Sequence, residues 1–243
     1  MNAKELTPEL RARYFNAFFS RRGWRALDDL YRFDYALLRY RQAGDDRLLD
    51  ILDADTTWAL VFVDNTATIY VRRQGPLAAV ARRHGYRLLG AGSAALERLD
   101  AAMADSAVRA VMRRELERQA ASSTADATAH TMLAYLALLE SRGADARRYF
   151  EAALAANPQK LGARMGLGMV ALAEGRPREA LDRFTAERRL DPHTPGLAFE
   201  TGRAWLALGD RSQARRWFRV ELEHHPDNAR ARDALAALEL RRL

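Results

Sequence analysis

The pattern of apolar, small and helix-breaking residues repeats every 34 positions in the second half of the chain. The marker positions are Leu133, Ala146, Phe150 and Pro158, then Leu167, Ala180, Phe184 and Pro192, and finally Thr201, Ala214, Phe218 and Pro226. Such a period is typical of stacked helical hairpins, in which small residues let two helices approach and an aromatic ring packs against the next hairpin. The pattern predicts hairpins at 127–160, 161–194 and 195–228.

Helix breakers and a last apolar stretch support this division. Gly175 and Gly209 are one period apart and mark the expected turn between the two helices of a hairpin. After Pro226, apolar residues at helical spacing predict a closing helix over 229–240, capped by Asp227 or Asn228. A closing helix is expected at the exposed end of such a stack.

The first half has a different, mixed pattern. Helices are expected at 24–31, 47–52 and from Gly75-Pro76 to 84, and strands at 33–40, 57–63, 66–72 and 86–89. Asp64 and Asn65 lie between two strands, and because this pair tolerates positive φ it predicts a tight hairpin. The sequence therefore predicts a small α/β domain over 1–92 with an N-terminal helix.

A third segment, 93–126, is expected to be a helical connector, since apolar residues recur at helical spacing over 94–119. Gly90-Ala-Gly92 before it superficially matches a dinucleotide fingerprint. The second strand and acidic residue that this motif requires do not follow, so a flexible joint is the expected role. The predicted fold class is α+β overall and mainly α, with the small α/β domain at 1–92 and the helical stack at 127–243.

Composition narrows the possible chemistry. The chain of 243 residues is 49% hydrophobic and contains no cysteine, which excludes disulfides, thiolate zinc sites and cysteine nucleophiles. No metal-ligand spacing, phosphate loop or nucleophile elbow occurs, so no catalytic, cofactor-binding or metal-binding residue is expected. No run is long enough to cross a membrane, and charged residues near Met1 predict a soluble chain without an export signal.

The net charge of +7 comes mainly from arginine, because only Lys4 and Lys160 among the 39 basic residues are lysines. The arginines occur in pairs along the whole chain, which argues against a concentrated nucleic-acid surface. We expect most of them on solvated helix faces beside neighbouring acids, namely Glu115, Glu117, Glu179 and Glu187. Peripheral contact with an anionic membrane stays compatible with this charge.

Residues 127–228 resemble the tetratricopeptide repeat (TPR) family in their marker residues and spacing. They differ in having Ala134 at a usual glycine position and Glu187 and Glu221 at a usual alanine position. The resemblance implies a noncatalytic protein-interaction module that binds a partner's peptide or helix through its concave face. The fifth and ninth positions of each repeat would line that face: Thr131, Tyr135, Met165, Met169, Phe199 and Arg203.

Lysine and asparagine, which grip a partner's terminal carboxylate in one TPR subclass, are absent from these six positions. Methionines beside aromatics favour an apolar, adaptable contact, with Arg203 available for one acidic group. The alternative is that some of the six, Met165 and Met169 in particular, pack inside the array.

Residues 30–38 and 58–73 resemble the soluble domain of bacterial glycosyltransferase-like membrane proteins related to protein mannosyltransferases. The matching stretches are Leu30-Tyr31, Phe33 to Leu38, Trp58 to Asn65 and Ala67 to Arg73. This resemblance implies a membrane-associated partner. It also implies an alternative function, the extracytoplasmic tail of a membrane-embedded enzyme whose catalytic residues lie outside the sequence.

Overall fold

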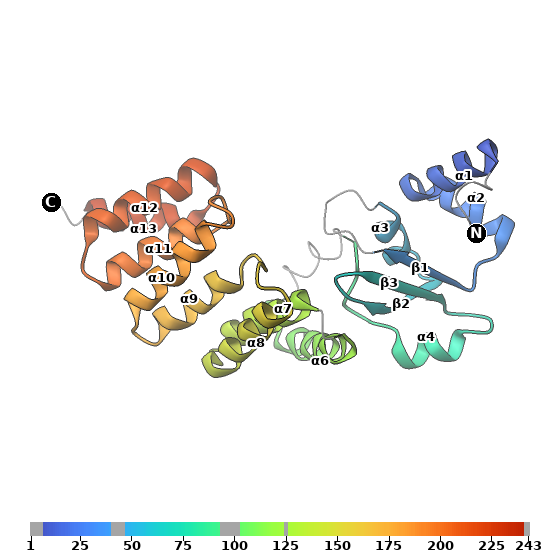
Figure 1. The fold of residues 1–243 in the computed structure, drawn as a ribbon, viewed down its shortest axis with the longest axis horizontal. Coiled ribbons are helices and arrows are strands. Elements are labelled where there is room, and N and C mark those ends of the chain that lie inside the picture. Colours follow the sequence, from blue (N-terminus) through green and yellow to red (C-terminus); the bar gives the residue numbers. More distant parts are fainter. Residues whose placement is uncertain (1–6, 40–46, 93–102, 124–125, 241–243) are drawn as a thin grey trace. The chain divides into compact units, whose positions relative to one another are not determined.

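The computed structural model describes residues 7–39, 47–92, 103–123 and 126–240. The chain divides into two compact units, Met1–Asp126 and Ala127–Leu243, so the expected connector segment is grouped with the first unit. The described residues are mainly helical with one small sheet, which confirms the predicted fold class. Figure 1 shows the sheet in the first unit and the series of helices in the second.

The first unit combines a three-stranded antiparallel sheet with helices on both faces. Its strand order is β1-β3-β2. Ala59 on β2 and Val71 on β3 pack with Ala81 on one face, while Tyr70 reaches Asp53 on the other. The elements are α1 (Pro8–Phe19), α2 (Arg21–Tyr31), β1 (Tyr35–Arg39), α3 (Arg47–Asp53), β2 (Trp58–Val63), β3 (Ala67–Arg72), α4 (Ala78–His84) and α6 (Ser106–Ser122).

The β2–β3 hairpin forms where expected, but by a different mechanism. Among the described non-glycine residues, positive φ occurs only at Arg32 and Ser141, so the turn does not use the left-handed conformation at Asp64 or Asn65. Asp64 Oδ1 instead accepts hydrogen bonds from the backbone N–H groups of Thr66 at 2.8 Å and Ala67 at 2.9 Å. A side-chain carboxylate therefore closes this turn.

The expected strand at 86–89 is wrong, because this segment is irregular. Glu115 of α6 accepts the backbone N–H groups of Arg87 at 2.7 Å and of Leu88 and Leu89 at 3.0 Å. The same interaction corrects the expectation that Glu115 lies on a solvated face, since the residue is only 8% exposed. The helix expected from 94 also differs: α6 begins at Ser106, after Asp105 as its N-cap, and 93–102 lie outside the described residues.

The second unit consists of helical hairpins followed by a closing helix, at the predicted positions (Figure 1). Gly175 and Gly209 have φ of 73° and 84° in the turns, a conformation that glycine adopts without steric cost. In the first hairpin Ser141 occupies the corresponding position with φ 59°. The elements are α7 (Ala127–Leu139), α8 (Gly143–Ala156), α9 (Ala163–Ala173), α10 (Pro177–Arg188), α11 (Leu197–Ala207), α12 (Arg211–His224) and α13 (Ala229–Leu240).

Phenylalanine rings against glycines set the spacing inside these hairpins. A Cβ atom at Gly168 would lie 2.3 Å from the ring of Phe184, and one at Gly202 would lie 2.5 Å from that of Phe218. The first hairpin has Ala134 instead of this glycine, and its Phe150 ring lies directly against Gly166 of the next hairpin. Ala134 therefore does not disturb the stack, because the ring of Phe150 packs against Gly166 on the following helix, α9.

The two glutamates that depart from the repeat pattern are buried helix caps. Glu187 accepts the backbone N–H of Gly162 at 2.6 Å, and Glu221 accepts that of Gly196 at 2.9 Å. Each carboxylate thereby binds an unpaired donor at the start of the first helix in its own hairpin. Glu187 is fully buried, which corrects the expectation that it lies on a solvated face beside arginines. Glu179 does lie near arginines, among them Arg176.

Candidate functional site

The six residues expected to bind a partner lie on the first helices of the three hairpins. Helix α7 contacts α9, and α9 contacts α11, so these helices are neighbours. Because the six residues occupy the same two positions in each helix, they follow one another along one side of the stack. We call this surface the first-helix face, formed by Thr131, Tyr135, Met165, Met169, Phe199 and Arg203.

At the α7 end, both residues take part in internal interactions. Thr131 is 7% exposed, and its hydroxyl donates to the carbonyl of Ala127 in the same helix at 2.7 Å. The Tyr135 hydroxyl donates to the carbonyl of Gly162 at 2.9 Å, and burial together with Glu187 raises the pKa of Tyr135. Only the half-buried ring of Tyr135 therefore presents surface to a ligand at this end.

Met165 and Met169 on α9 lie at the middle of the first-helix face. Both are half-buried and pack against a core cluster that contains Phe184 and Leu197. Each methionine side chain therefore packs partly against the core and is partly accessible to solvent. A flexible thioether side chain in this position can adapt to different apolar ligands.

The α11 end is charged. Phe199 is 6% exposed and packs on Phe218, whereas Arg203 is exposed and bonds Glu200 at 2.6 Å. Arg230 of the closing helix joins them: its guanidinium lies 4.6 Å from the ring centre of Phe199. Sequence reasoning missed Arg230 and Glu200. No repeat position indicates Arg230, because the corresponding residues one and two periods earlier are Gly196 and Gly162.

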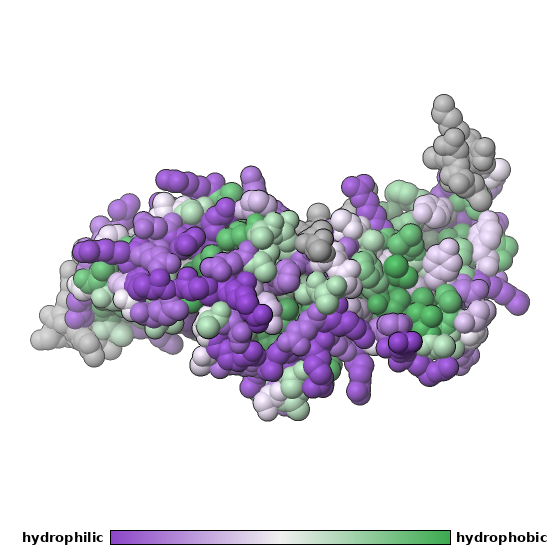
Figure 2. All heavy atoms as spheres, turned by 60° about the horizontal axis from the view of Figure 1, so that its bottom comes forward, coloured by the Kyte–Doolittle hydropathy of each residue, from purple (hydrophilic) through white to green (hydrophobic). Residues whose placement is uncertain are grey.

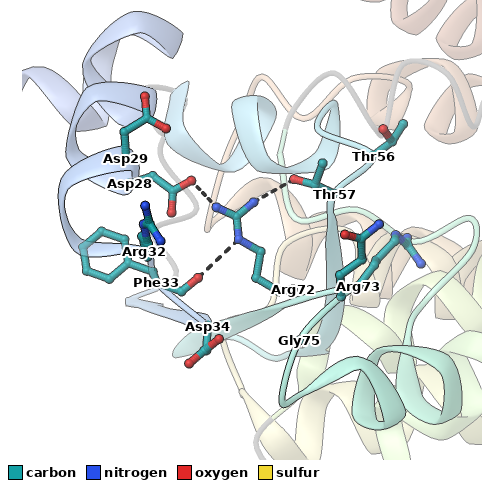
Figure 3. Close-up of a pocket in the computed structure, with 11 residues that line it drawn as sticks. Asp28, Asp29, Arg32, Phe33, Asp34, Thr56, Thr57, Arg72, Arg73 and Gly75 are labelled. Atoms are coloured by element: carbon teal, nitrogen blue, oxygen red, sulfur yellow. Dashed lines mark hydrogen bonds and ion pairs between the residues drawn. The ribbon is translucent and has the colours of Figure 1, made fainter.

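A separate cleft in the first unit has a volume of about 1070 Å³ and is lined mostly by charged and polar residues. Arg72 lies at its centre, where its guanidinium bonds Asp28, the Phe33 carbonyl and the Thr57 hydroxyl, as Figure 3 shows. The same guanidinium stacks on Trp58 at 4.3 Å. These contacts engage all three nitrogens of the Arg72 guanidinium and tie α2 to the sheet, so its primary role is structural.

The first unit also exposes many large apolar side chains. In Figure 2 green, hydrophobic areas lie over this unit at the right. The second unit in the same view is mainly purple, that is, hydrophilic. Among the described residues of this unit, the large apolar side chains that are exposed belong to Tyr14, Phe15, Phe19, Leu30, Tyr31, Tyr35, Leu37 and Val80.

Other candidate chemistry has structural explanations. Gly92 of the glycine-rich segment donates its backbone N–H to Asp53 at 2.8 Å, and a Cβ at Gly92 would clash with Asp50. This glycine therefore permits close packing on α3. Within the described ranges no group of three or more acidic or histidine residues is arranged to bind a metal ion. None of the described helices is both long and apolar enough to cross a membrane.

Comparison with protein families identifies the repeats. Two models described as tetratricopeptide repeat match residues 137–186 and 165–229. Residues 137–229 are therefore TPR repeats, as the sequence predicted. The resemblance of 30–38 and 58–73 to glycosyltransferase-like membrane proteins is not supported by these comparisons. No curated protein matches the sequence.

One solved structure gives the same result for the fold, and two further matches are reported beside it. A TPR protein of Thermus thermophilus is 23% identical with a TM-score of 0.52, over 60% of this chain and 80% of its own. The Yersinia enterocolitica type III secretion chaperone SycD, solved with a peptide of the translocator YopD, is 19% identical with a TM-score of 0.42, over 47% and 92%. The Arabidopsis OM64 TPR domain is 18% identical with a TM-score of 0.43, over 46% and 93%.

Proposed function

We propose that this protein is a noncatalytic interaction module that binds a peptide or helix of a partner protein through the first-helix face of its TPR unit. The observation that supports this most strongly is the partial burial of Met165 and Met169. They lie on the middle helix of the face, half-buried and packed on one side against the core. An adaptable apolar surface of this kind is common where proteins bind peptides.

The flanking residues complete the surface. The Tyr135 ring is fixed by the bond from its hydroxyl to Gly162 and by an edge contact with Phe150 at 5.1 Å. Arg203, with 43% of its side chain exposed, provides a cation at the other end. A ligand would thus meet a rigid aromatic, then two flexible thioethers, then a positive charge. Buried Thr131 and Phe199 support this surface from beneath.

Photo-crosslinking in the native cell tests the proposal. A photoreactive phenylalanine analogue would replace Met169, or Arg203, in the full chain, and mass spectrometry would identify the cross-linked protein. Arg178 on α10 and Arg216 on α12 are control positions, since both are exposed on second helices. We expect one partner cross-linked from Met169 and Arg203 and not from the controls. A partner cross-linked as strongly from Arg178 and Arg216 as from Met169 and Arg203, or from the controls alone, would contradict the proposal.

The same experiment examines the nature of the partner. If the partner is a membrane protein, as we propose from the sequence, the cross-linked product will fractionate with membranes. A soluble cross-linked partner would contradict this part of the proposal and leave the binding surface unchanged.

A further inference from the structure

The first-helix face ends in a charged cluster built from two helices. Glu200 of α11 has only 4% of its side chain exposed. Its Oε2 atom lies 2.6 Å from Nη1 of Arg203 on the same helix, and its Oε1 atom lies 3.5 Å from Nη2 of Arg230 on α13. One buried carboxylate therefore holds two guanidinium groups near each other. We call these three residues the arginine pair site.

The charges of this site do not balance. One carboxylate faces two arginines, which stay protonated at physiological pH. Burial raises the pKa of Glu200 in spite of both arginines, and the nearby buried carboxylate of Glu221 acts in the same direction while it accepts backbone N–H groups of Gly196 and Phe199. The three residues of the site therefore carry one more positive than negative charge, next to an apolar surface.

The two guanidiniums keep most of their hydrogen-bonding capacity. Each has five N–H donors, and the contacts with Glu200 use one nitrogen of each group. The side chains of Arg203 and Arg230 are 43% and 67% exposed. Donors of both arginines are thus accessible from solvent while their positions are fixed from below.

An aromatic ring further orients Arg230. Its guanidinium lies over Phe199, 4.6 Å from the ring centre, and Phe199 in turn packs on Phe218 at 5.6 Å. Stacking on the buried ring and the bond to the buried carboxylate both restrict the Arg230 side chain before a ligand binds. Arg230 therefore loses less conformational entropy on binding. The planar fork of arginine suits a carboxylate, which can accept two parallel N–H bonds.

We propose that the arginine pair site receives the carboxylate of an aspartate or glutamate side chain in the partner, and that the bound segment is apolar with an acidic end. This rests on the proposed binding function of the first-helix face. The apolar part would lie along Met169 and Met165, and the acidic residue would reach Arg203 and Arg230. The excess of one positive charge and the apolar neighbours favour such a peptide over the multiple phosphates of a nucleic acid, which require several cations.

Selection from a random peptide library tests this chemistry without knowledge of the natural partner. The full chain would be used to select 12-residue peptides displayed on phage, in parallel with the double variant R203Q/R230Q. The matched control is R178Q/R216Q, which loses the same charge from exposed positions on α10 and α12. Circular dichroism and thermal unfolding would establish that all three proteins are folded.

We expect peptides selected by the wild type and by the control to be enriched in aspartate or glutamate next to apolar residues. Replacing that acid by its amide should weaken binding to the wild type about tenfold, as measured by fluorescence anisotropy, and should not weaken binding to R203Q/R230Q. Binders without acidic enrichment, or an equal preference for acid in the double variant, would overturn the arginine pair site and leave the proposed function standing. A wild type that selects no binder would count against both.

Discussion

In both units buried glutamate carboxylates accept hydrogen bonds from backbone N–H groups, but only in the TPR unit does this contact repeat. In the TPR unit Glu187 and Glu221 cap the first helices of successive hairpins, exactly one period apart. In the first unit Glu115 binds three consecutive N–H groups of an irregular segment, and this contact has no repeat elsewhere among the described residues of the unit. A repeated contact leaves a pattern in the sequence, whereas a single long-range contact leaves none.

The units also differ in how regularly their cores are built. Phe150, Phe184 and Phe218 are almost fully buried in the TPR unit, each at the same position of its hairpin. Both units expose some large apolar side chains, such as Phe15 at 66% in the first and Leu139 at 66% in the second. The TPR core therefore repeats one packing contact, while the mixed unit depends on individual polar ties such as that of Arg72.

The largest effect is expected from a substitution that disrupts helix packing in the TPR unit. In G202A the new methyl group would lie 2.5 Å from the ring of Phe218, which has no space to move in a fully buried core. We expect a loss of about 3 kcal/mol in the free energy of unfolding, measured by chemical denaturation. The control is G143A, where nothing lies within 4 Å of the added atom. Equal stability of the two variants would contradict the packing described.

The second prediction concerns the contact between Glu115 and the backbone of residues 87–89 in the first unit. E115A would leave the N–H groups of residues 87–89 without their acceptor, at an expected cost of about 2 kcal/mol. Hydrogen exchange should become faster at 87–89 and stay unchanged in the TPR unit. E117A is the control, because Glu117 is exposed on the same helix. Unchanged exchange at 87–89 in E115A would show that Glu115 does not hold this segment.

A smaller effect is expected for one of the repeated caps. E187A would free the N–H of Gly162 but also remove a buried charge, so we expect a net loss of about 1 kcal/mol. Exchange should increase at the start of α9 and not at the start of α11, which Glu221 caps. Exposed Glu223 provides the control variant E223A. Faster exchange at both helix starts would mean that the caps do not act locally.

The smallest expected effect is stabilising. Ser141 adopts φ 59° where the later hairpins have glycine, and a serine side chain is strained in this conformation. We expect S141G to gain about 0.5 kcal/mol, because relief of strain exceeds the added entropy of the unfolded glycine. The opposite change, G175S, should lose a similar amount. Thermal unfolding measures the stability of both variants. A lower stability of S141G than of the wild type would contradict the strain assigned to Ser141.

The sequence predicted the TPR repeats because the residues that mark them recur every 34 positions. The same reasoning placed Glu115 and Glu187 on solvated faces, since a glutamate beside arginines has the same local pattern whether its carboxylate faces water or a backbone N–H group. It also predicted a strand at 86–89, where the decisive partner is a carboxylate far along the chain. At the candidate site, Arg203 was predicted from its repeat position, whereas Arg230 required the fold of the closing helix.

Methyl NMR of the full chain with ¹³C-labelled methionine tests the binding surface most directly. The chain has six methionines, of which Met165 and Met169 lie on the first-helix face, while Met103 and Met112 belong to the first unit. The titrant is the tightest peptide from the library selection. We predict that the methyl signals of Met165 and Met169 shift while those of Met103 and Met112 stay unchanged. Shifts confined to Met103 and Met112 would contradict the account.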